Sequence, residues 1–115
     1  MNKFVDLDTQ RITLQSFLDG QKSLLERNKL GQFATPSPLA REIVEETLKI
    51  LDQKNIKLLE PSVGTGSFIL NLLDNLPIGS TVEKLIGIEK HPLYGEATKE
   101  FYENTHIDLN HIVSD

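Results

Sequence analysis

Apolar and polar positions along the 115-residue chain change between helix-like and strand-like spacing. In 9–30, apolar residues recur near helical spacing, which predicts one amphipathic helix or two short helices meeting near Gly20. These residues are Leu14, Phe17, Leu18 and Leu25. A second helical pattern covers 38–53, with Ser37 as a suitable N-cap and Pro38 at the first helical position. Its predicted apolar face carries Leu39, Ile43, Val44, Thr47, Leu48 and Leu51.

Shorter apolar runs follow, separated by turn residues. They predict a strand at 58–60 that Asn55, Ile56 and Lys57 lead into, a helix at about 67–76, and a strand at 82–89. His91-Pro92 opens a further helix, and Ile107, Leu109, Ile112 and Val113 suggest a third strand ending at Ser114-Asp115. A strand–helix–strand unit of this size implies a right-handed parallel crossover. The sequence therefore predicts an α/β fold with a parallel sheet of about three strands behind N-terminal helices.

Composition narrows the class of protein. The length suits one small domain, and the apolar content of 38% suits a globular chain. There is no run of 18 apolar residues, no apolar signal core at the N-terminus and no cysteine. We therefore expect a cytoplasmic protein that does not enter a membrane.

The net charge of −5 argues against strong nucleic-acid binding by this segment alone. Strong DNA binding rests largely on Lys and Arg side chains that neutralise phosphates, and here they are scattered among a larger number of acidic residues. If the protein acts on DNA, its basic recognition surface should lie elsewhere.

Two glycines, Gly64 and Gly66, form the turn between the first predicted strand and the next helix. Glycine tolerates positive φ and lets a ligand approach the backbone, and the helix start that follows adds positive potential. A phosphate-binding P-loop would need a lysine after the last glycine, and the next lysine is Lys84. A dinucleotide loop would need a third glycine where this chain has Ile69. The sequence therefore argues against both a P-loop and a dinucleotide-binding loop.

With Glu60-Pro61 ahead of the turn and Phe68 behind it, the stretch resembles the first motif of class I S-adenosyl-L-methionine-dependent methyltransferases. Its form is similar to that of N6-adenine DNA methyltransferases of restriction-modification systems. The resemblance implies a Rossmann-like, doubly wound sheet with S-adenosylmethionine as cofactor. The cofactor-binding residues it implies here are Glu60, Pro61, Ser62, Gly64, Gly66 and Phe68. The alternative is a glycine turn that only lets a helix pack on a sheet.

The stretch 31–36 is a second point of resemblance. It is similar to the cofactor-proximal N-terminal motif of these enzymes, and this implies that Thr35, followed by Pro36, helps to hold the methionine end of the cofactor. A threonine hydroxyl can donate to a carboxylate near a helix start. The alternative is a helix-entry loop in which Thr and Pro serve turn geometry only.

Glu89 ends the second predicted strand, 23 residues after Gly66, and is the third point of resemblance. A carboxylate at a strand tip can accept both ribose hydroxyls. The family pattern implies adenine contact at Lys90, through its alkyl stem, and an acid near the adenine amino group, which Asp115 matches by position. The alternative for Glu89 is a solvated strand end. His91, His106 and His111 lack companions spaced for a metal, so we expect no metal.

The methyl-transfer motif of the family, Asn or Asp followed by Pro-Pro and an aromatic residue, is absent because the chain contains no Pro-Pro dipeptide. We therefore assign no catalytic residue and expect an N-terminal cofactor-binding part of a longer enzyme, inactive alone. In this interpretation 1–36 is a helical segment with the cofactor-proximal loop, and 37–115 begins the methyltransferase domain. DNA would be bound through the missing C-terminal part.

Two alternatives stay open. The acceptor could be a protein glutamine or an RNA, although the 31–36 stretch weighs against this. From another class, the chain could be a non-catalytic interaction module, since three parallel strands leave an edge and an apolar face unprotected. It would then form a homodimer or bind a partner chain that completes the sheet.

Overall fold

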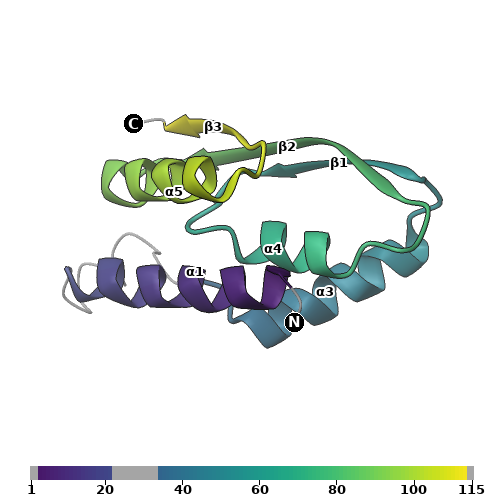
Figure 1. Cartoon of the computed structure of the whole chain (residues 1–115), viewed down its shortest axis with the longest axis horizontal. Helices are drawn as coiled ribbons and strands as arrows, with labels where there is room; N and C mark the ends of the chain where they lie inside the picture. Colours follow the sequence, from purple (N-terminus) through teal and green to yellow (C-terminus); the bar gives the residue numbers. More distant parts are fainter. Residues whose placement is uncertain (1–2, 22–33, 114–115) are drawn as a thin grey trace.

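The computed structural model describes residues 3–21 and 34–113, with side chains up to residue 110. It is an α/β fold, as the sequence predicted at that coarse level (Figure 1). In chain order the elements are α1 (Lys3–Gly20), α3 (Ser37–Ile50), β1 (Asn55–Glu60), α4 (Ser67–Asp74), β2 (Thr81–Glu89), α5 (Pro92–Thr105) and β3 (Asn110–Val113).

The sheet has the order β1-β2-β3, and both pairings are parallel. Leu58 lies opposite Leu85, and Ile88 lies opposite Ile112, so the three carboxyl ends meet at one edge. The described helices all lie on one face of the sheet, with α4 and α5 nearest to it (Figure 1). That edge is consequently where the loops after β1 and β2 come together.

The core fills the space between the sheet and these helices. Ile69 and Leu70 of α4 are fully buried, and they meet Ile56 and Leu85 from the strands. α3 and α1 pack against α4 and form a further layer below it. Burial of this kind, about 25 cal/mol per Å² of apolar surface, holds α4 in place at the end of the glycine loop.

The other face of the sheet is open in the described part of the chain. Side chains alternate along a strand, so Ile56 and Leu58 point to the core while Lys57 and Leu59 point away from it. Leu59 is 59% exposed, although both faces of a parallel sheet are normally covered.

The first predicted helix differs from α1 in extent and in its buried face. α1 begins at Lys3, because Phe4 and Leu7 also pack on the core. Phe17 is 64% exposed instead of lying on the apolar face, whereas its neighbour Leu18 is buried. The buried row includes Arg11, a charged residue that periodicity cannot assign to a core face. Leu25 and the rest of 22–30 lie outside the described residues.

The start and the buried face of the second helix also differ from expectation. Ser37 is inside α3 and caps nothing; its hydroxyl donates to Asp8 Oδ2 at 2.5 Å, and Pro36 occupies the cap position without a side-chain bond. Of the predicted apolar face, Val44 is buried and Leu48 packs against the core, but Leu39 is exposed, and Ala40 is buried in addition. The small Ala40 permits close packing, which favours this face over the one with larger residues.

Further boundaries differ from the predicted ones, and α4 ends at Asp74 instead of about 76. α3 ends at Ile50 instead of 53, because Leu51 is already extended. β1 begins at Asn55 instead of 58, since Ile56 is buried and pairs with Val82 before a bulge. β3 begins only at Asn110, since the chain leaves α5 through a left-handed turn and reaches the sheet edge three residues later than expected. The predicted end of β3 at 114–115 lies outside the described residues.

Candidate functional site

A cavity of about 610 Å³ lies at the carboxyl edge of the sheet. Its wall is built by the glycine loop after β1, the carboxyl end of β2, the start of α5, the segment before α3, and two residues of α1. Ligands of open α/β sheets bind outside the carboxyl ends of the strands, and this volume suits a small organic molecule. The fold thus gathers segments that are far apart in the sequence around one hollow.

Most of the residues selected from the sequence line this cavity. They are Thr35, Glu60, Pro61, Ser62, Gly64, Phe68, Glu89 and Lys90. Pro36 and Gly66 do not line it. Asp115 lies outside the described residues, as do 31–33 of the predicted N-terminal motif.

The two glycines serve different purposes. Gly64 and Gly66 both have positive φ, 55° and 91°, as the turn requires. Gly64 lines the cavity, whereas a Cβ on Gly66 would lie 1.9 Å from Oη of Tyr102. The Tyr102 hydroxyl in turn lies within hydrogen-bond distance of the carbonyls of Thr65 and Gly66, at 3.0 and 3.2 Å. Gly66 is therefore needed for the packing of α5 on the loop. The expectation that a glycine leaves room for a ligand applies only to Gly64, because only Gly64 lines the cavity.

Both selected carboxylates hold backbone N–H groups. Glu60 Oε1 accepts from the amide of Ser62 at 2.9 Å. Glu89 accepts from the amide of Gly64 through Oε1 at 3.2 Å and from the amide of His91 through Oε2 at 3.1 Å. Each of these oxygens has a second lone pair for a ligand. Glu89 is thus placed at the cavity wall by the two loops that it joins.

Sequence reasoning missed the contribution of α1. Arg11 and Gln15 line the cavity and bind the glycine loop through Thr65. The Thr65 hydroxyl donates to Gln15 Oε1 at 2.7 Å and accepts from Arg11 Nη1 at 3.1 Å. The one available signal was that Arg11 lies on the same helix face as Leu7 and Leu18. No local sequence pattern links Arg11 to Thr65, which is 54 positions away.

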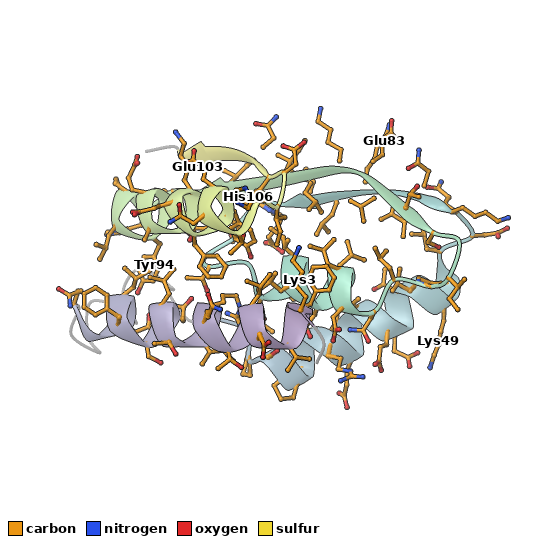
Figure 2. All side chains as sticks on the ribbon, in the orientation of Figure 1. Lys3, Lys49, Glu83, Tyr94, Glu103 and His106 are labelled. Atoms are coloured by element: carbon orange, nitrogen blue, oxygen red, sulfur yellow. The ribbon has the colours of Figure 1, made fainter. Side chains whose placement is uncertain are left out.

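α5 holds the same loop from the other side. The Thr98 hydroxyl donates to the Gly64 carbonyl at 2.6 Å. Tyr94 points from α5 toward α1, and its hydroxyl donates to Asp19 at 2.6 Å (Figure 2). The glycine loop is therefore fixed between two helices that precede and follow it in the chain.

The segment before α3 is attached to the start of α4. The carbonyl of Thr35 accepts from the Ser67 hydroxyl at 3.0 Å, and Asn71 donates to the Ser37 hydroxyl at 3.1 Å. Thr35 thus lies beside the first turn of α4, where no side chain caps the helix. This is the positive end of the helix dipole.

The histidines have structural roles where their side chains are described. Nδ1 of His91 accepts from the amide of Leu93 and caps α5, and His106 ends α5 with a φ of 59°. Within the described ranges, no three metal-ligating side chains form a group. The helices described there also include none with the length and apolar character needed to cross a membrane.

No known protein-family model matches this chain. The fold and the cavity define an α/β protein with a ligand-sized hollow at the carboxyl edge of a parallel sheet.

Proposed function

We propose that this chain is the S-adenosylmethionine-binding part of an adenine-specific DNA methyltransferase, the type that modifies the N6 amino group, with a Rossmann-like class I fold. The observation that supports the proposal best is the common cavity of Thr35, the Gly64 loop and Glu89. These three points of resemblance were selected as separate motifs. Convergence on one hollow is what a shared ligand requires.

The donors and acceptors of the cavity suit this cofactor. Its ribose hydroxyls are donors, and Glu89 offers acceptors at the end of β2. Its sulfonium and ammonium groups are cationic, and Glu60 lies in the same wall. Lys90 and Pro92, which follow Glu89, provide aliphatic surface for the adenine. Thr35 would hold the methionine end beside the first turn of α4.

When bound, the cofactor supplies an activated methyl group. The residues of this chain would bind and orient it, and the backbone bonds from Glu60 and Glu89 would keep the loop rigid around it. The chain contains no Pro-Pro dipeptide and hence lacks the motif by which the family holds the amino group of a flipped adenine. Cofactor binding and methyl transfer are therefore separable properties, and we assign the first to this chain.

The proposal is tested by calorimetric titration of the chain with S-adenosylmethionine. We expect binding, and we expect Glu89→Gln to weaken it by about tenfold or more, since the amide lacks a charged acceptor. Glu83→Gln is the matched control, because Glu83 is on the same strand but is exposed and points away from the helices (Figure 2). No binding by the unaltered chain, or equal effects of the two substitutions, would count against the proposal.

The open face of the sheet favours a second candidate, an interaction module whose partner covers that face. Leu59 lies opposite Ile86 there, and no described helix covers the pair. Among the described residues β1 and β3 are the edge strands of the sheet, and an edge strand can pair with a partner through its backbone. The two candidates are compatible, because the cavity and the open face are different surfaces.

A further inference from the structure

Arg11 is the buried cation of the cavity. It lines the hollow, yet its exposed fraction is only 2%. Its Nε donates to Asp8 Oδ1 at 2.6 Å and its Nη1 donates to Thr65. Within 3–21 and 34–110, no hydrogen bond is made by its remaining nitrogen, Nη2. A guanidinium has five N–H donors, so the two contacts leave most of them for another acceptor.

The other charged groups of the cavity wall are arranged around Arg11 in a consistent way. Glu89 holds Gly64 from the β2 side, whereas Arg11 holds the next residue, Thr65, from the α1 side. Lys90 is the other cation among the described lining residues, and it is exposed beside Glu89. The wall therefore carries an acceptor of ribose hydroxyls on one side of the loop and a buried cation on the other.

Arg11 also lies on the side of the loop where the N-terminal motif lies. Thr35 is bound to Ser67, the first residue of α4, and Arg11 is bound to Thr65, two residues earlier. Both flank a helix start that no side chain caps. An anion placed there would meet a guanidinium, a hydroxyl and the positive end of the α4 dipole together.

We propose that Arg11 binds the carboxylate of the amino-acid end of the cofactor and so selects for ligands that carry it. This rests on the proposed function, because it assumes S-adenosylmethionine as the ligand. Asp8 orients the guanidinium through Nε and, held by Ser37 at 2.5 Å, ties α1 to α3. The attraction between the remaining guanidinium N–H groups and a carboxylate in direct contact is strong at this position, since buried surroundings screen it poorly.

The competing role for Arg11 is purely structural, as a link between α1 and the glycine loop. Two ligands separate the roles: S-adenosylmethionine and its decarboxylated form, which keeps the nucleoside, the sulfonium and the amine but lacks the carboxylate. Loss of a structural link would weaken both ligands alike. Loss of a carboxylate contact would weaken only the first.

The experiment measures Kd for both ligands by calorimetry on four proteins: the unaltered chain, Arg11→Gln, the double variant Asp8→Asn/Arg11→Gln, and Lys90→Gln. We expect the unaltered chain to prefer S-adenosylmethionine by about tenfold or more, and both Arg11 variants to lose most of this preference. Lys90→Gln should weaken both ligands alike and so keep the preference, because the contact proposed for Lys90 is with the adenine that both ligands carry. Arg11→Gln alone leaves the Asp8 carboxylate unpaired and could unfold the chain. The double variant removes both charges of the pair and therefore keeps the test possible in that case.

The possible failures differ. If the unaltered chain binds neither ligand, the proposed function is wrong and this inference falls with it. If it binds both ligands equally, or if a folded Arg11 variant keeps the preference, the cofactor assignment stands and the role of Arg11 is wrong. An equal loss of both ligands in the Arg11 variants assigns Arg11 to structure and also overturns the inference.

Discussion

Gly66 shows how a single position satisfies two independent demands. Its φ of 91° is unfavourable for any residue with a Cβ, and the Tyr102 hydroxyl occupies the space that a Cβ would need. The first demand is common to many tight turns. The second exists only because α5 returns across the loop, so it belongs to this tertiary structure.

Gly66→Ala and Gly79→Ala separate the two demands. Gly79 has a similar φ of 87° but nothing within 4 Å of its Cβ position, so its substitution should cost only the backbone term, about 1–2 kcal/mol. Gly66→Ala adds overpacking and should cost about 2–5 kcal/mol in total. Urea unfolding followed by circular dichroism measures both. Equal losses would mean that Tyr102 moves aside without cost.

Burial raises the pKa of Tyr102, with a smaller lowering by the nearby Arg11 charge. Since the folded pKa is above the unfolded one, the contribution to stability is complete at neutral pH and is lost as the pH rises above about 10. We expect the free energy of unfolding to fall with alkaline pH in the unaltered chain. In Tyr102→Phe, which loses about 1 kcal/mol at neutral pH with its hydrogen bond, the fall should be shallower.

Urea titrations of both proteins between pH 7 and pH 11 test this. The informative quantity is the difference between the two free energies, because it cancels groups that titrate equally in both proteins. A difference that stays constant across this range would contradict the burial of a neutral phenol at this position.

At the scale of elements, α1 shows most clearly how tertiary context selects one helix face. Leu7 and Leu18 are buried together with Arg11, and the polar members of the helix reach the glycine loop and α5. The packing of α1 against α4 and α5 therefore builds one wall of the cavity. A helix that appears from its pattern to be a simple cover is part of the candidate site.

Leu18→Ala and Phe17→Ala test that face with adjacent residues of one helix. Leu18 is buried at 2% exposure, so its truncation should cost about 2–5 kcal/mol. Phe17 is largely exposed, and its truncation should change the free energy of unfolding by less than about 0.5 kcal/mol. Thermal or urea unfolding gives both values. A larger loss at Phe17 than at Leu18 would place the opposite face of α1 against the core.

At the scale of the whole molecule, the described part of the chain has a cavity at one edge of the sheet and a sheet face that no described helix covers. The helices on the covered face supply the core and the site. On the other face Leu59 remains 59% exposed. Parallel sheets are normally covered on both sides, so this face has the character of a contact surface.

If a second copy can cover that face, the average mass measured by light scattering should rise with protein concentration. Leu59→Lys should suppress the rise, because it places a charge in the contact. Ile78→Lys is the control, since Ile78 is also exposed but lies in the turn before β2. A monomer at all concentrations would contradict self-association through this face.

Methyl transfer is a second property at this scale. With labelled S-adenosylmethionine and unmethylated DNA, we expect no label on adenine from this chain by itself, because its sequence lacks the Pro-Pro motif that would hold the target amino group. Binding of the cofactor in the same sample by equilibrium dialysis is the control that the site is intact. Label on adenine would show that another group in this chain replaces the expected motif.

Much of the fold followed from local pattern. The strand ending at Glu60, the Gly64–Gly66 turn and the acid at the end of β2 are short-range features, so the sequence is sufficient to predict them. The start of α1 and part of the predicted buried face of α3 were wrong, because the choice among possible faces depends on what packs against them. Arg11 could not be predicted as a site residue, since no local sequence pattern indicates that it contacts Thr65.

By itself the sequence determined the order of helices and strands, the glycine turn and the carboxylate at the tip of β2, because backbone preferences and side-chain periodicity act over a few residues. The tertiary structure alone decided that Thr35, Gly64 and Glu89 share one hollow, that Gly66 is reserved for Tyr102, and that a buried arginine of α1 completes the wall. Those relations join residues tens of positions apart, and only the packing of the helices on one face of the sheet brings them within bonding distance.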